Sequence, residues 1–268
     1  MAEIIKGRRS VRTFDGAGVT AQDLQKLRQY AESLDNPFGV PVRIVFLDAK
    51  EYGLSSPVLA GEKLYAAGIV AESAHTDAAF GYSFEKFVLY AWSLGIGTTW
   101  IAGTMDRKQF EEAAAPGEGE RMPCITPLGY PAEKKSLRES LMRRGVGADK
   151  RMPAEKLCFE DAFGKVLSEE TMKAYGGLIE MVRWAPSAVN KQPWRLVFCD
   201  GAVHFYEKKD SGFVSEATGD LQKIDVGIAL YHFAAGLAEQ GRQSVISVND
   251  PGIACPDNTE YVASILIE

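Results

Sequence analysis

Two seven-residue stretches lie 152 positions apart (194 − 42) and have nearly the same sequence, which restricts the fold of this chain more than any other feature. V-R-I-V-F-L-D runs from Val42 to Asp48, and W-R-L-V-F-C-D runs from Trp194 to Asp200. Both are rich in β-branched and aromatic residues, which predicts strands. Each follows a helical pattern of apolar residues, at 19–34 and at about 168–184. The repetition indicates two copies of one helix–strand unit.

The rest of each half continues in the same order. A second, more apolar helix is predicted over 82–94 and again over 225–237. A closing strand is predicted over 124–130 and again over 261–267. Helices that alternate with strands in this way indicate an α+β or α/β sandwich.

The length of 268 residues and the 46% share of hydrophobic residues allow a sizeable core. From the repeat we predict a first half at 1–135 and a second half at 166–268. The stretch between them, 136–165, is predicted to be a connection that carries a basic segment.

The charge and the composition exclude several classes of partner. A net charge of −6 and a pI near 5.3 argue against nucleic acid and anionic membranes. We find no apolar run long enough to span a bilayer and no signal-peptide core. The four cysteines form no C-x-x-C and the three histidines have no ligand spacing. We therefore expect a cytoplasmic protein with free thiols and no metal site.

A basic segment close to the start of the chain, R-R-S-V-R-T-F at 8–14, is a candidate anion site. In an extended segment Arg8, Ser10 and Arg12 would share one face. Guanidinium groups offer planar, permanently charged donors that suit a phosphate. By itself the segment could equally be a solvated basic terminus.

A loop in the second half, A-P-S-A-V-N-K-Q-P-W at 185–194, lies between a predicted helix and a predicted strand. Pro186 and Pro193 restrict its two ends. Ser187, Asn190 and Gln192 supply donors and acceptors that could read the edge of a planar, amide-rich ring. Taken alone, the same residues would also suit an ordinary connection.

Together the segment at 8–14 and the loop at 185–194 resemble the FMN-dependent nitroreductase family. The resemblance covers nearly the whole chain and implies a nitroreductase-like α/β sandwich. In that family the arginine segment holds the flavin phosphate and ring, and the serine loop reads the pyrimidine edge. We therefore expect Arg8, Arg9, Ser10 and Arg12 at one side of an FMN, and Pro186, Ser187, Ala188 and Asn190 at the other.

The two halves have diverged in complementary ways. Nitroreductases are usually two-fold homodimers whose two flavins each touch both subunits. Here the first half keeps the arginine segment, but its loop has become D-N-P-F-G-V-P at 35–41. The second half keeps the serine loop without an arginine segment before its helix. The resemblance therefore implies an internally duplicated, single-chain pseudo-dimer with one FMN, similar to the tandem (TM nitroreductase-like) branch, that is self-sufficient as a monomer.

The resemblance assigns two more parts of the site. The segment W-I-A-G, which comprises Trp100, Ile101, Ala102 and Gly103, corresponds to the family's backbone that passes flavin N5. Lys150 and Arg151 correspond to a late basic segment at the phosphate, for which Arg143 and Arg144 are alternatives. Arg12 corresponds to a cation that faces the flavin N1 and C2 carbonyl. The G-x-G at 95–97 is no dinucleotide loop, because it follows a helix and lacks the third glycine.

The predicted activity is that of an FMN-dependent oxidoreductase of nitroreductase type. Hydride would pass from NADH or NADPH through flavin N5 to a nitroaromatic, quinone or similar small-molecule acceptor. No side chain is predicted to be catalytic, because the cofactor carries the chemistry. The alternatives are an FMN-binding sensor or storage protein with little turnover, a structural relative without FMN, and an enzyme for dehalogenation or flavin cleavage.

Overall fold

The computed structural model describes residues 1–134 and 136–268, so the predicted end of the first half at residue 135 lies outside the described residues. The first half is built from four helices and three strands. These are α1 (Ala2–Gly7), α2 (Ala21–Glu32), β1 (Val42–Asp48), β2 (Leu64–Ala71), α3 (Thr76–Ser93), α4 (Arg107–Ala114) and β3 (Glu120–Leu128).

The remainder of the chain adds three longer helices, two single-turn 3₁₀ helices and seven strands. These are α5 (Leu137–Gly145), η1 (Ala154–Lys156), β4 (Cys158–Glu160), α6 (Glu169–Arg183), η2 (Ala188–Asn190), β5 (Trp194–Cys199), β6 (Ala202–Lys208), β7 (Val214–Ser215), β8 (Gly219–Asp220), α7 (Leu221–Glu239), β9 (Ser244–Ser247) and β10 (Thr259–Ile267).

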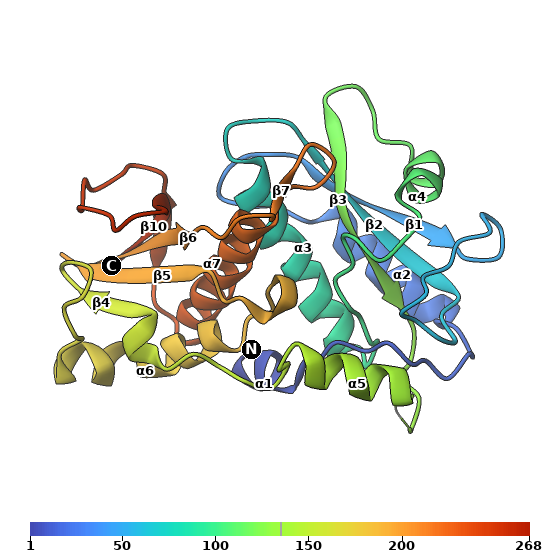
Figure 1. Cartoon of the computed structure of the whole chain (residues 1–268), viewed down its shortest axis with the longest axis horizontal. Helices are drawn as coiled ribbons and strands as arrows, with labels where there is room; N and C mark the ends of the chain where they lie inside the picture. Colours follow the sequence, from blue (N-terminus) through green and yellow to red (C-terminus); the bar gives the residue numbers. More distant parts are fainter. Residues whose placement is uncertain (135) are drawn as a thin grey trace.

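Two larger sheets lie at opposite ends of the molecule (Figure 1). The first has the strand order β1-β2-β3 and is antiparallel throughout. The second has the order β4-β5-β6-β10-β9, in which β5-β6-β10 repeats the antiparallel arrangement of the first sheet. Strand β4, from the predicted connection, adds to the second sheet parallel to β5.

Helices α3 and α7 pack against each other between the sheets (Figure 1). Both are buried on most sides, as expected of helices that are apolar all round. Two glycines allow their close approach. A Cβ at Gly81 would lie 2.0 Å from the Ile224 carbonyl oxygen, and one at Gly227 would lie 2.2 Å from the Ala78 carbonyl oxygen. Any larger residue at these positions would force the helices apart.

The contacts at this helix crossing are reciprocal. Ala78 and Gly81 of α3 meet Gly227 and Ile224 of α7, and adding 146 to each α3 number gives the other two residues (224 − 78; 227 − 81). A reciprocal contact of this kind is the signature of a two-fold interface. The arrangement places corresponding surfaces of the two helices on opposite sides of the crossing.

The predicted elements are confirmed, with shifted ends. Strand β1 has the predicted bounds and β5 ends one residue early, while α3 begins at Thr76 instead of residue 82 and α7 at Leu221 instead of residue 225. The earlier starts have local causes. In α7, for example, the Asp220 carboxylate accepts from the N–H groups of Gln222 and Lys223 and caps the helix.

The connection at 136–165 is more structured than the sequence analysis predicted. It contains α5, η1 and β4 instead of a plain linker. Helix α5 is capped by Ser136, whose hydroxyl accepts from the Glu139 N–H at 3.1 Å. Within the described part of the chain, no helix combines the length and the apolar character needed to cross a membrane.

Candidate functional site

The arginine segment runs beside the segment 97–101, which joins two predicted parts of the site. Arg8 follows α1 with extended backbone angles (φ −64°, ψ 134°). The Val11 N–H donates to the Thr98 carbonyl at 2.8 Å, and Ser10 pairs with Thr98 in a parallel bridge. Because Val11 is buried, its polar neighbours lie along the other side of this extended segment.

Arg8 has the most buried guanidinium of the segment. Its side chain is 4% exposed, and its Nε lies 3.8 Å from Oε1 of the fully buried Glu85. Its Nε and Nη1 have no hydrogen-bond partner among the described residues. Burial lowers the pKa of Arg8, and the Glu85 carboxylate opposes that effect. Unpaired buried donors of this kind are the expected feature of an anion site.

Several other arginines converge on Arg8. The positive charge of Arg143 lowers the pKa of Arg8, of Arg12 and of Arg151, in each case after the larger effect of burial. Arg151 stacks on the Trp184 ring, with its guanidinium carbon 4.6 Å from the ring centre. The structure therefore brings the predicted Arg151 and its alternative Arg143 to the same cluster.

Three further guanidinium nitrogens are buried without a hydrogen-bond partner in the described part of the chain, Nε of Arg9, of Arg151 and of Arg121. The last belongs to an arginine of β3 that is ion-paired with Glu72 and Asp77. Arg151 uses its Nη1 on the carbonyls of Ala148 (2.8 Å) and Lys150 (2.9 Å). The Lys150 side chain is exposed, and the backbone carbonyl of Lys150 makes the contacts to the site. Of the two predicted residues, Arg151 is the one whose charge faces the cluster.

A cavity of about 400 Å³ lies between α5 and the segment 147–150. Its charged lining residues are Arg143, Arg144, Lys150 and Asp149, so the positive charges outnumber the negative. Arg143 is partly neutralised because it donates to Asp149 at 2.5 Å. Through this cavity, whose lining is mainly basic, the arginine cluster is open to solvent.

Glu139 on α5 is a contact that the sequence analysis missed. Its buried carboxylate accepts from the Arg12 N–H at 3.2 Å and from the Thr13 hydroxyl at 2.9 Å. It therefore fixes the backbone of the arginine segment, and its charge opposes the lowering of the Arg12 pKa by burial. No periodic pattern marks this residue, because the contact joins elements more than a hundred positions apart in the sequence.

The serine loop holds the segment that carries Arg151. The Asn190 amide donates to the carbonyls of Gly147 (2.9 Å) and Lys150 (3.0 Å). Within the loop, the Ser187 hydroxyl accepts from the Gln192 N–H at 2.9 Å. Asn190 thus has a positioning contact that the sequence analysis did not predict.

The backbone of the serine loop is strained. Val189, Asn190 and Gln192 have φ values of 44°, 59° and 52°, in the left-handed region. Asparagine tolerates this region, whereas a β-branched valine there is an outlier. Each such residue costs about 1–3 kcal/mol and persists where the surroundings fix it, often at functional sites.

A buried carboxylate on α7 anchors the same loop. Asp225 accepts from the Ala188 N–H, with its Oδ2 at 3.0 Å from the nitrogen. Burial raises the pKa of Asp225 well above its usual range, and the bond from Ala188 opposes that shift. Ala188 and the preceding Pro186 and Ser187 are half-buried. The loop is therefore fixed to the central helix of its own half.

The segment 97–101 has a buried face and an unused hydroxyl. The Thr98 hydroxyl is buried without a hydrogen-bond partner in the described residues, and Ile101 pairs with Ile125 of β3. The Ala102 carbonyl accepts from Arg107 at 2.7 Å, and Gly103 is exposed with no atom close to its Cβ direction. Gly103 therefore has open space beside its backbone.

The Trp100 side chain contacts the core between the two halves. Its indole N–H donates to Oε2 of Glu85 at 3.0 Å, and its ring meets Phe84 edge-on at 4.7 Å between ring centres. These contacts support a structural role for the Trp100 side chain, in the packing between α3 and the segment 97–101.

Glu85 and His232 form a buried pair across the central helices. His232 Nε2 lies 3.0 Å from Glu85 Oε1, and His232 Nδ1 lies 2.9 Å from the Met181 carbonyl. Because a carbonyl only accepts, Nδ1 must carry a hydrogen. The contact at Nε2 then needs one further proton, on either the ring or the carboxyl group.

The sequence analysis did not identify Glu85 or His232. A signal was present, because each is a polar residue in a largely apolar helix, and a buried polar residue requires a partner. A single sequence does not reveal that these two residues face each other, since they lie 147 positions apart (232 − 85). The pair links the arginine segment, Trp100 and the second half in one network.

The chain belongs to the protein family described as "Putative TM nitroreductase", whose sequence pattern matches residues 1–237. The mixed α+β nitroreductase fold predicted from the sequence is confirmed by a structural match to a nitroreductase-family protein (tm1586) from Thermotoga maritima MSB8. That match covers 99% of this chain and 93% of the other, with a TM-score of 0.58 at 22% identity. No curated protein matches the chain significantly.

Two further solved structures are similar over a smaller part of the chain. One is described as an oxidoreductase containing FMN, with 18% identity, a TM-score of 0.51, and coverage of 61% of this chain and 92% of that one. The other is an FMN-dependent nitroreductase from Clostridium difficile R20291, with 20% identity, a TM-score of 0.43, and coverage of 51% and 90%.

Proposed function

We propose that this chain is an FMN-dependent oxidoreductase of nitroreductase type. The observation that carries the proposal is the set of buried, unpartnered guanidinium nitrogens of Arg8, Arg9 and Arg151 in the described residues. Leaving a buried donor unpaired costs about 1–3 kcal/mol, and more for a charged group. A phosphate would satisfy these donors. Membership of the nitroreductase family supports FMN as its source.

The phosphate would be held by Arg8, Arg9, Ser10 and Arg151. Arg12 would lie at the N1 side of the ring, where a fixed positive charge stabilises the reduced, anionic cofactor. At about 4 Å and an effective dielectric constant near 20, one such charge contributes roughly 4 kcal/mol before desolvation. Pro186, Ser187 and Ala188 would face the pyrimidine edge, and Asn190 would position the segment of Arg151.

When bound, FMN would supply hydride-transfer chemistry between NADH or NADPH and a nitroaromatic, quinone or similar acceptor. The chain's own residues would bind the cofactor and orient it. Trp100, Ile101, Ala102 and Gly103 would border the central ring, where Gly103 has open space beside it. Glu85 holds Trp100 through the indole N–H and so keeps this segment next to Arg8.

The proposal includes a single-chain pseudo-dimer with one flavin, active as a monomer. The reciprocal contacts of α3 and α7 support it, because a two-fold interface uses the same patch twice. A second pair of strands is related by the same shift on one side. Ile101 pairs with Ile125 of β3, and Ser247 of β9 pairs with Ser264 of β10, so the first partners are 146 positions apart (247 − 101) and the second partners 139 (264 − 125). Segment 97–101 and β9 then hold equivalent places in the two halves.

The visible absorption spectrum of the purified protein tests the flavin. We expect the bands of bound FMN at about one per chain, bleached within seconds by NADH or NADPH without oxygen. Bound FMN that does not bleach would favour the sensor or storage alternative. A colourless protein that takes up no added FMN would refute the proposal.

The two-halves argument has its own test. Arg12→Ala and Ser187→Ala lie 175 positions apart (187 − 12) and should each weaken the same FMN site, measured as the FMN Kd by fluorescence quenching. Ser33→Ala, at an exposed helix end, serves as the control and should leave the Kd unchanged. An unchanged Kd in Ser187→Ala would contradict a site shared between the halves.

A further inference from the structure

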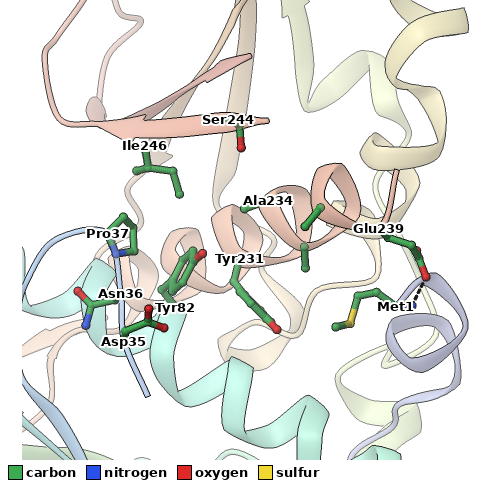
Figure 2. A pocket seen from close by; sticks show the side chains of 12 residues that line it. Met1, Asp35, Asn36, Pro37, Tyr82, Tyr231, Ala234, Glu239, Ser244 and Ile246 are labelled. Atoms are coloured by element: carbon green, nitrogen blue, oxygen red, sulfur yellow. Dashed lines mark hydrogen bonds and ion pairs between the residues drawn. The ribbon is translucent and has the colours of Figure 1, made fainter. Parts of the chain in front are cut away.

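A second cavity, of about 650 Å³, lies beside α7 on the side away from the arginine cluster. Its volume is within the range of small-molecule sites, about 300–1,000 Å³. Figure 2 shows Tyr82 of α3 and Tyr231 of α7 in its wall, Ser244 and Ile246 of β9 opposite them, and Pro37 at one end. The cavity is therefore bordered by both halves of the chain.

Its walls are the counterparts of the proposed flavin site. The shift of 146 positions that relates α3 to α7 takes Glu85 to Tyr231 (231 − 85). The same shift relates segment 97–101 to β9, and it takes Thr98 to Ser244 (244 − 98). Pro37, in turn, belongs to the 35–41 loop that stands in the first half where the serine loop stands in the second. By this correspondence, the cavity lies where a second copy of the proposed flavin site would lie.

The cavity owes its room to small side chains. Ala234, Ala235 and Ala238 line it on α7. Their counterparts on α3, at 88, 89 and 92, are valine, leucine and tryptophan, all of which are larger. The rings of Tyr82 and Tyr231 meet edge-on with 5.1 Å between their centres and give one wall aromatic character.

The charges differ from those of the arginine cluster. Among the described residues, the cavity lining contains no arginine or lysine, and its charged side chains are Asp35 and Glu239. Asp35 pairs with Lys86, and Glu239 pairs with the Met1 amino group (Figure 2). Burial raises the pKa of Tyr82 to about 12, so its phenol stays neutral and can donate. A phosphate finds no guanidinium here.

We propose that this cavity binds a planar aromatic ligand that carries a positive charge and no phosphate. Tyrosine faces attract cations, and carboxylates with free lone pairs accept from a protonated amine. The cavity lies between helix α7 and strand β9, and its carboxylates, each paired with one cation, keep acceptor lone pairs where the arginine cluster has unpaired guanidinium donors. The proposal rests on the pseudo-dimer arrangement and requires no turnover at the flavin site.

Two three-ring dyes test the proposal by calorimetric titration of the full chain loaded with FMN. Proflavine is a planar cation and resorufin a planar anion of similar size. We expect one proflavine per chain and at least tenfold weaker binding of resorufin. Absence of proflavine binding would overturn the proposal, and equal affinity for resorufin would overturn its charge assignment.

Variants on β9 locate the bound dye. Ser244→Trp places a large ring in the cavity and should weaken proflavine binding at least tenfold. Val245→Trp adds the same ring to the next residue, which is exposed and points to the opposite face of the strand, and should leave binding unchanged. Asp35→Asn removes a negative charge without adding volume to the cavity and should weaken proflavine binding several-fold. It replaces Ser244→Trp as the test if that variant does not fold.

Retained binding in Ser244→Trp together with loss in Arg12→Ala would place the dye at the arginine cluster and overturn the proposal. The FMN content of each variant is read from its absorbance in the same samples. Unchanged FMN content with no dye binding refutes only the cavity. Dye binding by a protein that takes up no FMN refutes only the proposed flavin function.

Discussion

The arginine cluster and the cavity beside Tyr82 and Tyr231, here called the tyrosine cavity, occupy corresponding places on the two central helices. They are nevertheless suited to ligands of opposite charge. Glu85 stands in one where Tyr231 stands in the other, and the first has buried guanidinium groups where the second has carboxylates. The backbone contacts at Gly81 and Gly227 remain reciprocal. The comparison teaches that one backbone framework can be kept while a few side chains decide what each side binds.

The largest expected effect comes from Glu85→Leu. It would leave Arg8 and His232 buried beside an apolar group, which typically costs about 3–5 kcal/mol. Urea unfolding measures the loss. Glu111→Leu breaks an ion pair of Arg107 within one turn of α4 and should cost less than about 1 kcal/mol. Equal losses would show that Glu85 is not the centre of the network.

Arg8→Ala should produce the next largest effect. A hydrogen bond to a charged group contributes about 1.5–3 kcal/mol, which corresponds to roughly a 10- to 150-fold rise in the FMN Kd. Arg8→Lys keeps a positive charge without the planar donors, so its FMN Kd should lie between that of the parent protein and that of Arg8→Ala. Arg28→Ala removes an arginine that lies over Phe46 instead and is the control. A normal Kd in Arg8→Ala would remove the difference between the two sites.

Glu207→Gln tests a difference between the two larger sheets. In the first sheet Val42 faces Val70, and at the matching place in the second Trp194 faces Glu207. Burial raises the pKa of Glu207 to about 8, and the charge of Asp220 adds to that shift. Both Glu207 oxygens and the Trp194 indole N–H are buried without hydrogen-bond partners in the described residues, and Lys223 Nζ lies 3.9 Å from Glu207 Oε2.

The sign of the pH dependence follows from these values. The folded state holds the Glu207 proton up to about pH 8, whereas the unfolded chain releases it above about pH 4.5. Stability therefore falls between these values as the pH rises, by at most about 1.4 kcal/mol per pH unit. Urea unfolding at several pH values should show a flatter profile for Glu207→Gln. A profile identical to that of the parent protein would contradict the raised pKa.

Val189→Gly should have the smallest effect, and it should be stabilising. The left-handed conformation costs a β-branched residue about 1–2 kcal/mol, while glycine adds back about 0.5–1 kcal/mol of chain entropy. The corresponding loop of the first half uses Gly39 (φ 65°) for its left-handed residue. Thermal unfolding measures the gain. Val245→Gly, in strand β9, is the contrast and should destabilise.

Sequence reasoning succeeded where chemistry is local. Strand β1 was predicted with its observed ends, because five of its seven residues are apolar and three of those are β-branched, which favours a strand without help from distant contacts. It failed at the first turn of α3, where the structure extends six residues before the predicted start (82 − 76). Thr76 there bonds to the Ala71 and Ser73 carbonyls, a local arrangement that hydrophobic periodicity does not report.

The candidate site divides in the same way. Arg8, Arg12, Ser187 and Asn190 could be proposed from two short segments, because guanidinium, hydroxyl and amide groups have recognisable chemistry. Glu139 could not, since its contact with Arg12 depends on where α5 packs. The assignment of these residues to FMN stays a prediction.

By itself the sequence predicted the helices and strands, among them the apolar central helices, and the two polar segments of the candidate site, since each depends on residues close together in the chain. Only the tertiary structure decided that Arg8, Arg143 and Arg151 meet, and that Glu85 faces His232 across the helix crossing. It alone decided that a tyrosine-lined cavity occupies the matching place in the other half. The physical reason is that buried charges and cavities depend on which surfaces pack together, and the packing of α3 on α7 sets that for both sides.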